Sequence, residues 1–224
     1  MAEVLGVLTK YNQLMYQGLQ ETLYMVGFSL IIAVSCGIPL GILTAITRKG
    51  HILENKVLHK FLDIIINIGR SIPFIILMVA VIPFTRLLVG TSIGTTAAIV
   101  PLALAAIPFV GRVIDNSIQE VSLGVIEAAQ SMGATPGQIV WKVLLPESLP
   151  SIILGITLTA INLIGYSAMA GAIGGGGLGD IAIRYGYQRF KIGIMIETVV
   201  ILIILVQVIQ WFGNKLAAYF DHKT

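Results

Sequence analysis

Cysteine and charged residues are both scarce in this sequence, and each scarcity excludes a class of protein. The single cysteine, Cys36, lies in an apolar stretch, so neither disulfides nor paired-cysteine metal or redox sites are available. We expect Cys36 to be a small buried packing residue. Only 11% of the 224 residues are charged and 56% are hydrophobic, whereas roughly 25% are charged in a soluble domain. The composition is that of a membrane protein.

Motifs for nucleotide binding and catalysis are also missing. There is no G-x-x-x-x-G-K-[ST] phosphate loop, and the glycine-rich run GAIGGGGLGD at 171–180 is interpreted as a tightly turned connection. The histidines 51, 59 and 222 form no Ser-His-Asp, Cys-His or H-E-x-x-H arrangement. The net charge of +3 is scattered between apolar runs instead of forming a stripe. We therefore expect no catalytic residues, cofactor, metal site or nucleic-acid partner for this chain.

Long apolar runs dominate what is present. A bilayer-crossing helix needs about 20 mostly apolar residues, and five stretches qualify: 20–46, 61–84, 92–112, 150–170 and 191–213. Prolines within or beside these stretches indicate kinked helices that pack on one another. The sequence predicts an all-α membrane protein with five transmembrane helices in one domain over residues 1–224.

Basic residues in short loops predict the orientation, because Lys and Arg favour the cytoplasmic side. Only Lys10 precedes the first stretch, and Lys215 and Lys223 follow the last. The loop after the first stretch holds four basic residues: Arg48, Lys49, Lys56 and Lys60. The N-terminus should therefore lie outside, the C-terminus inside, and the connection over 113–149 in the cytoplasm. Three residues on the predicted external side depart from the rule: Arg184, Arg189 and Lys191.

Residues 122–146 form a polar segment between two apolar stretches. Ser122 is a candidate N-cap for one short helix, and Thr135-Pro136 with Gln138 has the pattern of a capping box that starts a second. Pro146 and Pro150 are expected to punctuate the entry to the next span. The segment should therefore form two short helices around a glycine turn.

Two interpretations of this segment remain open from composition alone. Its small residues would let a partner's surface approach the backbone, and Glu127 adds one fixed charge. These small residues are Ala128, Ala129, Gly133, Ala134 and Gly137. Alternatively, Ile126, Ile139 and Trp141 could hold an amphipathic loop on the lipid headgroups.

A longer motif runs through the same residues. Glu127-Ala128-Ala129, Gly133 after three residues, and Val143-x-Leu145-Pro146 after nine more resemble the EAA-x3-G-x9-I-x-LP signature of bacterial ABC-importer permeases. Val143 in place of isoleucine is the one departure. The resemblance implies a cytoplasmic coupling helix that docks on a separate ATPase, with Glu127, Ala128, Ala129, Gly133, Ala134, Gly137 and Pro146 as the coupling residues.

The resemblance covers nearly the whole chain. Residues 70–94 and 165–187 are similar to the methionine-uptake, MetI-type branch of these permeases. It implies a type I ABC-importer core in a bacterial inner membrane, transport of D- or L-methionine by alternating access, and a homodimer. It also implies two ATPase subunits that bind ATP and Mg and sense methionine through a regulatory domain, and a periplasmic or lipid-anchored binding protein. Three alternatives stay open: the same kind of importer for another amino acid or small molecule, a secondary transporter or channel that acts alone, and a membrane scaffold that transports nothing.

Polar residues within the apolar stretches are the remaining candidates for function. Asn162, Tyr166, Ser167 and Met169 predict a pathway, with Met169 as its gate, although ordinary packing is the alternative. Asp63, Asn67 and Arg70 share a helix face and could contact substrate or satisfy one another. Glu197, the only acid of the last span, could serve transport or a packing pair.

Overall fold

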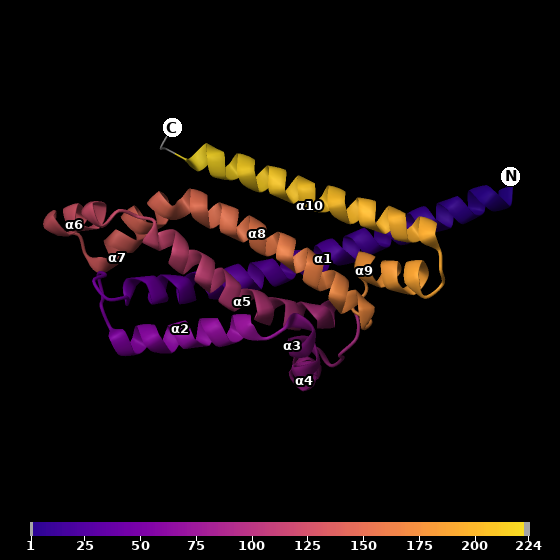
Figure 1. Cartoon of the computed structure of the whole chain (residues 1–224), viewed down its shortest axis with the longest axis horizontal. Helices are drawn as coiled ribbons and strands as arrows, with labels where there is room; N and C mark the ends of the chain where they lie inside the picture. Colours follow the sequence, from indigo (N-terminus) through magenta and orange to yellow (C-terminus); the bar gives the residue numbers. More distant parts are fainter. Residues whose placement is uncertain (1, 222–224) are drawn as a thin grey trace. The chain divides into compact units, whose positions relative to one another are not determined.

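The described part of the chain is entirely helical. The computed structural model describes residues 2–221, and their side chains from residue 11 onward. Within these residues every element is a helix and no strand occurs (Figure 1), which confirms the predicted all-α class. His222 and Lys223 lie outside the described residues, as does the side chain of Lys10.

The helices follow one another with short connections. In chain order they are α1 Ala2–Ile46, α2 Lys56–Ser71, α3 Phe74–Ala80, α4 Ile82–Val89, α5 Thr95–Gln119, α6 Leu123–Ser131, α7 Pro136–Ile139, η1 Val140–Leu144, α8 Leu145–Ala172, α9 Gly177–Ile181, η2 Ala182–Tyr187 and α10 Ile192–Phe220, where η marks a π-helical segment. The connection expected at 171–190 is therefore largely helical.

Four of the described helices are long and apolar enough to cross a membrane. They cover Tyr11–Ile46, Thr95–Gln119, Pro136–Ala172 and Ile192–Phe220. The count rises to five if the bent pair Lys56–Ser71 and Phe74–Ala80 forms one span. The chain is thus a multi-pass membrane protein by the length and composition of its helices.

The predicted span over 61–84 is not one continuous helix. Ile72 adopts an extended backbone (φ −80°, ψ 122°) directly before Pro73, because a proline disfavours helical geometry in the residue that precedes it. A second break falls at Val81, between α3 and α4. Proline alone does not decide such breaks, since Pro39 lies inside α1 and Pro150 inside α8.

The chain divides into two compact units. The first contains residues 2–31, 73–104 and 160–208, and the second contains 32–72, 105–159 and 209–221. In the second unit, glycines bring helix backbones close together. A Cβ on Gly41 would lie 2.5 Å from both the Gly111 carbonyl oxygen and the Ile114 Cβ, and one on Gly155 would lie 2.1 Å from Val113. Small residues let the helices pack this closely. Close packing stabilises helix association in a bilayer, because lipid provides no hydrophobic force that drives helices together.

The first unit is built around the glycine run. Met15, Leu178, Ile181 and Ile194 form a buried apolar cluster. Gly176 and Gly177 have φ values of +81° and +80°, a backbone region that only glycine enters at little cost. Glu21 accepts a hydrogen bond from the Gly177 N–H at 2.7 Å, and Thr22 accepts one from the Leu178 N–H at 2.9 Å. The glycine run is thus a docked structural turn.

Cys36 does not have the expected environment. Its side chain is exposed on α1, so the prediction that it fills a buried position is wrong for the chain as described. The segment around Cys36 is apolar on every side, and its sequence therefore did not distinguish a buried face from one open to lipid or to another subunit.

Candidate functional site

The 122–146 segment folds as two short helices around a glycine turn. Ser122 is the N-cap of α6, but its side chain makes no capping hydrogen bond. After α6 the Gly133 N–H donates to the Gln130 carbonyl oxygen at 2.9 Å, and Gly133 has a φ of +80°. A residue with a Cβ would be strained at this position. The turn therefore depends on Gly133.

The capping box at the second helix is present as predicted. The Thr135 hydroxyl accepts from the Gln138 N–H at 3.4 Å, and the Gln138 side-chain oxygen accepts from the Thr135 N–H at 2.9 Å. Pro136 occupies the first helical position, where a backbone N–H would have no acceptor within the helix, so the missing N–H of proline costs nothing. These contacts start the helix at its predicted residue.

The prolines after this helix do not interrupt it. The helical run continues from Pro136 to Ala172 and includes Pro146 and Pro150, so the predicted punctuation is wrong. In the π-helical segment η1, the Leu145 N–H donates to the Val140 carbonyl oxygen, five residues back. This wider turn carries the backbone to Pro146, which supplies no N–H of its own.

Burial divides the segment into an inward and an outward face. Ile126 and Ile139 are buried, and so is Ala129. Glu127, Ala128, Gly133, Gly137 and Pro146 are exposed, and Ala134 is half-buried. A Cβ on Gly133 or Gly137 would meet nothing within 4 Å. Two of the three residues that supported a headgroup-bound loop therefore face the protein, and the exposed elbow is small and open.

α6 and α7 lie next to each other in the second unit, beyond the ends of α5 and α8 (Figure 1). The 122–146 segment joins two of the long apolar helices, α5 and α8. A displacement of the segment would therefore act directly on two spans.

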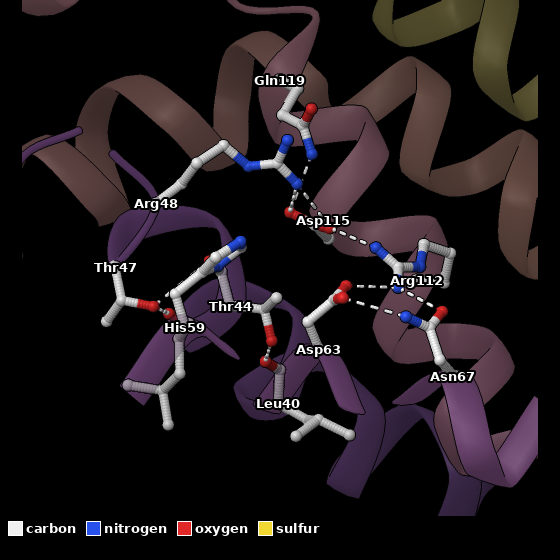
Figure 2. A network of polar contacts seen from close by, with 11 residues as sticks. Leu40, Thr44, Thr47, Arg48, His59, Asp63, Asn67, Arg112, Asp115 and Gln119 are labelled. Atoms are coloured by element: carbon white, nitrogen blue, oxygen red, sulfur yellow. Dashed lines mark hydrogen bonds and ion pairs between the residues drawn. The ribbon is translucent and has the colours of Figure 1, made fainter. Parts of the chain in front are cut away.

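A polar network that the sequence analysis did not identify lies at the end of α5 that precedes this segment. Asp115 is fully buried, and its carboxylate accepts from Arg48 at 3.1 Å, Arg112 at 3.0 Å and Gln119 at 2.9 Å (Figure 2). Two arginines around one buried carboxylate satisfy its charge and most of its acceptor positions. The sequence signal for this network was Asp115 itself, an acid one turn beyond the end of the apolar stretch predicted over 92–112.

Arg112 extends the network to α2. Its guanidinium donates to Asp63 at 2.6 Å and to Asn67 at 2.8 Å, and Asn67 donates to Asp63 at 2.9 Å (Figure 2). Arg70 lies apart, with its guanidinium 5.8 Å from the centre of the Phe109 ring. The structural interpretation of Asp63 and Asn67 is therefore supported, with Arg112 as the partner that the spacing pattern could not supply.

His51 lies at the edge of this network, in the turn between α1 and α2. Burial lowers the pKa of His51 below its usual 6.5, and the nearby positive charge of Arg48 lowers it further, while Asp115 acts in the opposite direction. The His51 Nδ1 and Arg48 Nε atoms are buried without a hydrogen-bond partner among the described residues. Protonation of His51 would therefore place a second cation beside Arg48.

The four predicted pathway residues do not share one environment. On α8, Asn162, Tyr166 and Met169 lie on one face by helical spacing, and Met169 is 47% exposed. Tyr166 stacks on Phe74 with ring centres 4.6 Å apart. Ser167 is buried and donates to the Ile164 carbonyl oxygen at 2.8 Å. Met169 alone of the four presents a free apolar tip.

Glu197 is exposed on α10, and it has no hydrogen bond or ion pair with any side chain in the described part of the chain. It borders a shallow hollow with Asn12 and Met15. The predicted packing pair for Glu197 is therefore not formed among the described side chains.

The described residues, all in helices and short connections with several helices able to cross a membrane, define a multi-pass membrane protein. A family model described as "binding-protein-dependent transport system inner membrane component" matches residues 37–224. The chain belongs to this family.

Curated relatives match most of the chain. It is 57% identical over 203 residues to the probable D-methionine transport system permease protein MetI of Vibrio cholerae, which covers 91% of this chain and 90% of the relative. It is 52% identical over 158 residues to the D-methionine transport system permease protein MetI of Escherichia coli, with 70% of this chain and 73% of the relative covered.

Solved structures agree with the fold. A chain of the inward-facing MetNI methionine ABC transporter superposes with a TM-score of 0.92 at 48% identity, over 94% of this chain and 97% of that one. A chain of an amino-acid ABC transporter crystallised with histidines gives a TM-score of 0.72 at 22% identity, over 97% of each. The second likeness concerns the fold alone.

Removal of the buried carboxylate should be costly. We expect Asp115→Ala to lower the free energy of unfolding by about 3 kcal/mol, because Arg48 loses its carboxylate partner while Arg112 keeps only Asp63. Lys56→Ala is the control, since Lys56 and Glu54 form an exposed pair at 4.0 Å that contributes at most about 1 kcal/mol. Thermal unfolding in detergent measures both, and equal midpoints would contradict this role of Asp115.

The lowered pKa of His51 predicts a pH dependence. Between the folded pKa and 6.5 the unfolded chain binds more protons, so stability is full above pH 6.5 and falls as the pH drops through this window. His51→Gln should therefore reduce the loss of thermal stability between pH 7.5 and pH 5.5. His59→Gln, which leaves His51 in place, should keep the slope of the unaltered chain. A slope that His51→Gln does not change would exclude His51 as its source.

Proposed function

We propose that this chain is the membrane permease subunit of an ATP-driven ABC importer for methionine, in its D or L form. The proposal is supported by the elbow around Gly133, which is exposed, carries little side-chain bulk and interrupts an otherwise apolar chain. The 57% identity to a probable D-methionine permease supports the choice of cargo.

The proposed assembly contains two copies of this chain and two separate ATPase subunits. One elbow per chain requires two chains to serve an ATPase pair, and closed dimers are the commonest symmetric oligomers. ATP and Mg would be bound by the ATPases, which could also carry a methionine-sensing regulatory domain. A periplasmic or lipid-anchored binding protein would deliver methionine to the external side of a bacterial inner membrane.

The proposed topology has five spans, with the N-terminus outside and the C-terminus inside. The basic residues Arg48, Lys49, Lys56 and Lys60 between α1 and α2 support a cytoplasmic first loop. α2 and α3 together would supply the fifth crossing beyond the four long helices. This topology directs the 122–146 segment into the cytoplasm, where the ATPases are.

Coupling would pass from the ATPases through the exposed residues Glu127, Ala128, Gly133, Ala134 and Gly137. Buried Ala129 would contribute by letting α6 pack closely on the chain itself, and Pro146 would lie at the root of α8. Because the segment is continuous with α5 and α8, closure of the ATPases would move both helices. The network around Asp115 would transmit the movement of α5 to the first loop and α2.

The coupling role predicts that bulk at the elbow separates transport from folding. Gly133→Trp should leave the amount of chain in the membrane nearly unchanged but reduce co-purification with the ATPase and ATP-driven methionine uptake by at least about tenfold. The measurements are quantitative membrane blots, pull-down of co-expressed ATPase and uptake of labelled methionine.

Gly50→Trp is the matched control. Gly50 has a φ of +79°, almost that of Gly133 at +80°, and a Cβ on either glycine would meet nothing within 4 Å. Both variants therefore introduce the same strain and bulk, and only Gly133→Trp should disconnect the ATPase. Normal uptake by Gly133→Trp, or an equal loss in both variants, would contradict the assignment of the elbow.

Met169 is proposed as the gate of the pathway, closing against its counterpart in the second copy. Its exposed thioether can re-pack as the pathway opens. Met169→Cys in a Cys36→Ala background should cross-link the dimer without nucleotide and cross-link less with ATP bound. If other exposed α8 positions cross-link and Met169→Cys does not, the gate lies elsewhere.

A further inference from the structure

A basic and aromatic cluster stands at the junction of η2 and α10 and has no place in the proposed transport mechanism. It consists of Tyr11, Tyr185, Arg189 and Lys191, all within the first unit. In the proposed topology these cations lie on the external side, where loops carry few Lys and Arg residues. They therefore require an explanation.

The two cations of the cluster are not neutralised within the described chain. The Arg189 guanidinium lies 4.6 Å from the centre of the Tyr185 ring. Lys191 lies 4.9 Å from the centre of the Tyr11 ring and donates a hydrogen bond to its hydroxyl. The nearby Arg184 pairs with Asp180, whereas among described side chains no carboxylate pairs with Arg189 or Lys191. The aromatic rings position both cations without neutralising their charges, so both can bind an anion.

The cluster borders a hollow rather than a flat surface. The hollow has a volume of ≈ 430 Å³, and Gln13, Leu14 and Gln17 complete its lining. Guanidinium, ammonium, amide and phenol groups are all hydrogen-bond donors, and none of the lining side chains is acidic. This composition suits an anion that carries several acceptor oxygens, such as a phosphodiester.

The cluster lies next to the start of a membrane span. Ile192 is the first residue of the candidate span Ile192–Phe220, and Lys191 precedes it directly. The Lys191–Tyr11 hydrogen bond holds this start against α1. Tyr187, Phe190 and Ile192 beside the cluster are 67%, 85% and 72% exposed. Exposed aromatic and apolar side chains next to cations are typical of the headgroup boundary.

We propose that Tyr11, Tyr185, Arg189 and Lys191 form a binding site for the phosphate headgroup of an anionic phospholipid. Arg189 and Lys191 neutralise the phosphate, and the amide of Gln13 supplies a further donor, whereas the Gln17 amide donates to Glu21 at 3.0 Å. Phe190 and Ile192 contact the upper acyl chains. The exposed apolar flank favours a lipid over a soluble anion, because a soluble anion gains nothing from it.

The test uses the full chain, purified in a mild detergent, with phosphatidylglycerol and phosphatidylcholine as the probes. Native mass spectrometry measures the lipid bound at equal concentrations. Phosphatidylglycerol should bind more tightly, and Arg189→Gln/Lys191→Gln should weaken its binding by about 30-fold, since each cation near anionic lipid contributes about fivefold. The charge-preserving Arg189→Lys/Lys191→Arg pair should retain most of the preference.

Arg86→Gln/Lys215→Gln is the matched control, because it removes the same charge from two exposed cations. Lys215 lies 4.3 Å from the centre of the Trp211 ring, much as Lys191 lies over Tyr11, and the Arg86 guanidinium donates to the Ser92 hydroxyl at 3.2 Å. This control should bind phosphatidylglycerol like the unaltered chain. An equal loss in both double variants would overturn the site and leave only a general charge effect.

Two further results would overturn the proposal. Inorganic phosphate that displaces phosphatidylglycerol at millimolar concentration would indicate a small-anion site. Equal binding of the two lipids, with a soluble acidic peptide bound instead and released by Arg189→Gln/Lys191→Gln, would indicate a protein-docking surface. Unchanged thermal unfolding midpoints of the variants verify that they are folded.

Discussion

The buried carboxylate of Asp115 is the constraint on which the second unit depends. A charge that is removed from water is costly unless it is paired, and Asp115 meets this requirement only by holding Arg48 from the first loop and Arg112 from its own helix. Arg112 in turn binds Asp63 on α2. Three parts of the chain that are far apart in sequence are therefore held by one set of charges, at the end of α5 that leads into the 122–146 segment.

In the proposed coupling, close helix packing would help this network to transmit movement. Gly41 and Gly155 let their helices approach the backbone and side chains of α5 without a Cβ between them. A displacement of α6 or α7 would therefore act on α5 as a rigid helix, because α5 is packed against its neighbours and bound to them by ion pairs. The elbow itself has the opposite character, because a Cβ on Gly133 or Gly137 would meet nothing within 4 Å.

Local signals were readable from the sequence, and distant partners were not. The apolar runs predicted an all-helical membrane chain, and Thr135 with Gln138 predicted a capping box that is present, because both signals act over a few residues. The Arg48–Asp115 pair spans 67 residues, and no spacing rule links them. The burial of two small residues was also predicted wrongly, since Cys36 is exposed and Ala129 is buried. A small or apolar residue suits either face of a membrane helix, so its identity does not indicate which face it occupies.

ATP-coupled uptake in a reconstituted system would show whether this chain is the permease of an ATP-driven importer. The chain would be placed in liposomes with its ATPase and binding protein, and accumulation of labelled methionine against a gradient would be followed with and without ATP inside the compartment that the 122–146 segment faces. We expect accumulation only when the ATPase and ATP are both present, and no ATP hydrolysis by the chain alone. Uphill accumulation by the chain without the ATPase would contradict this expectation.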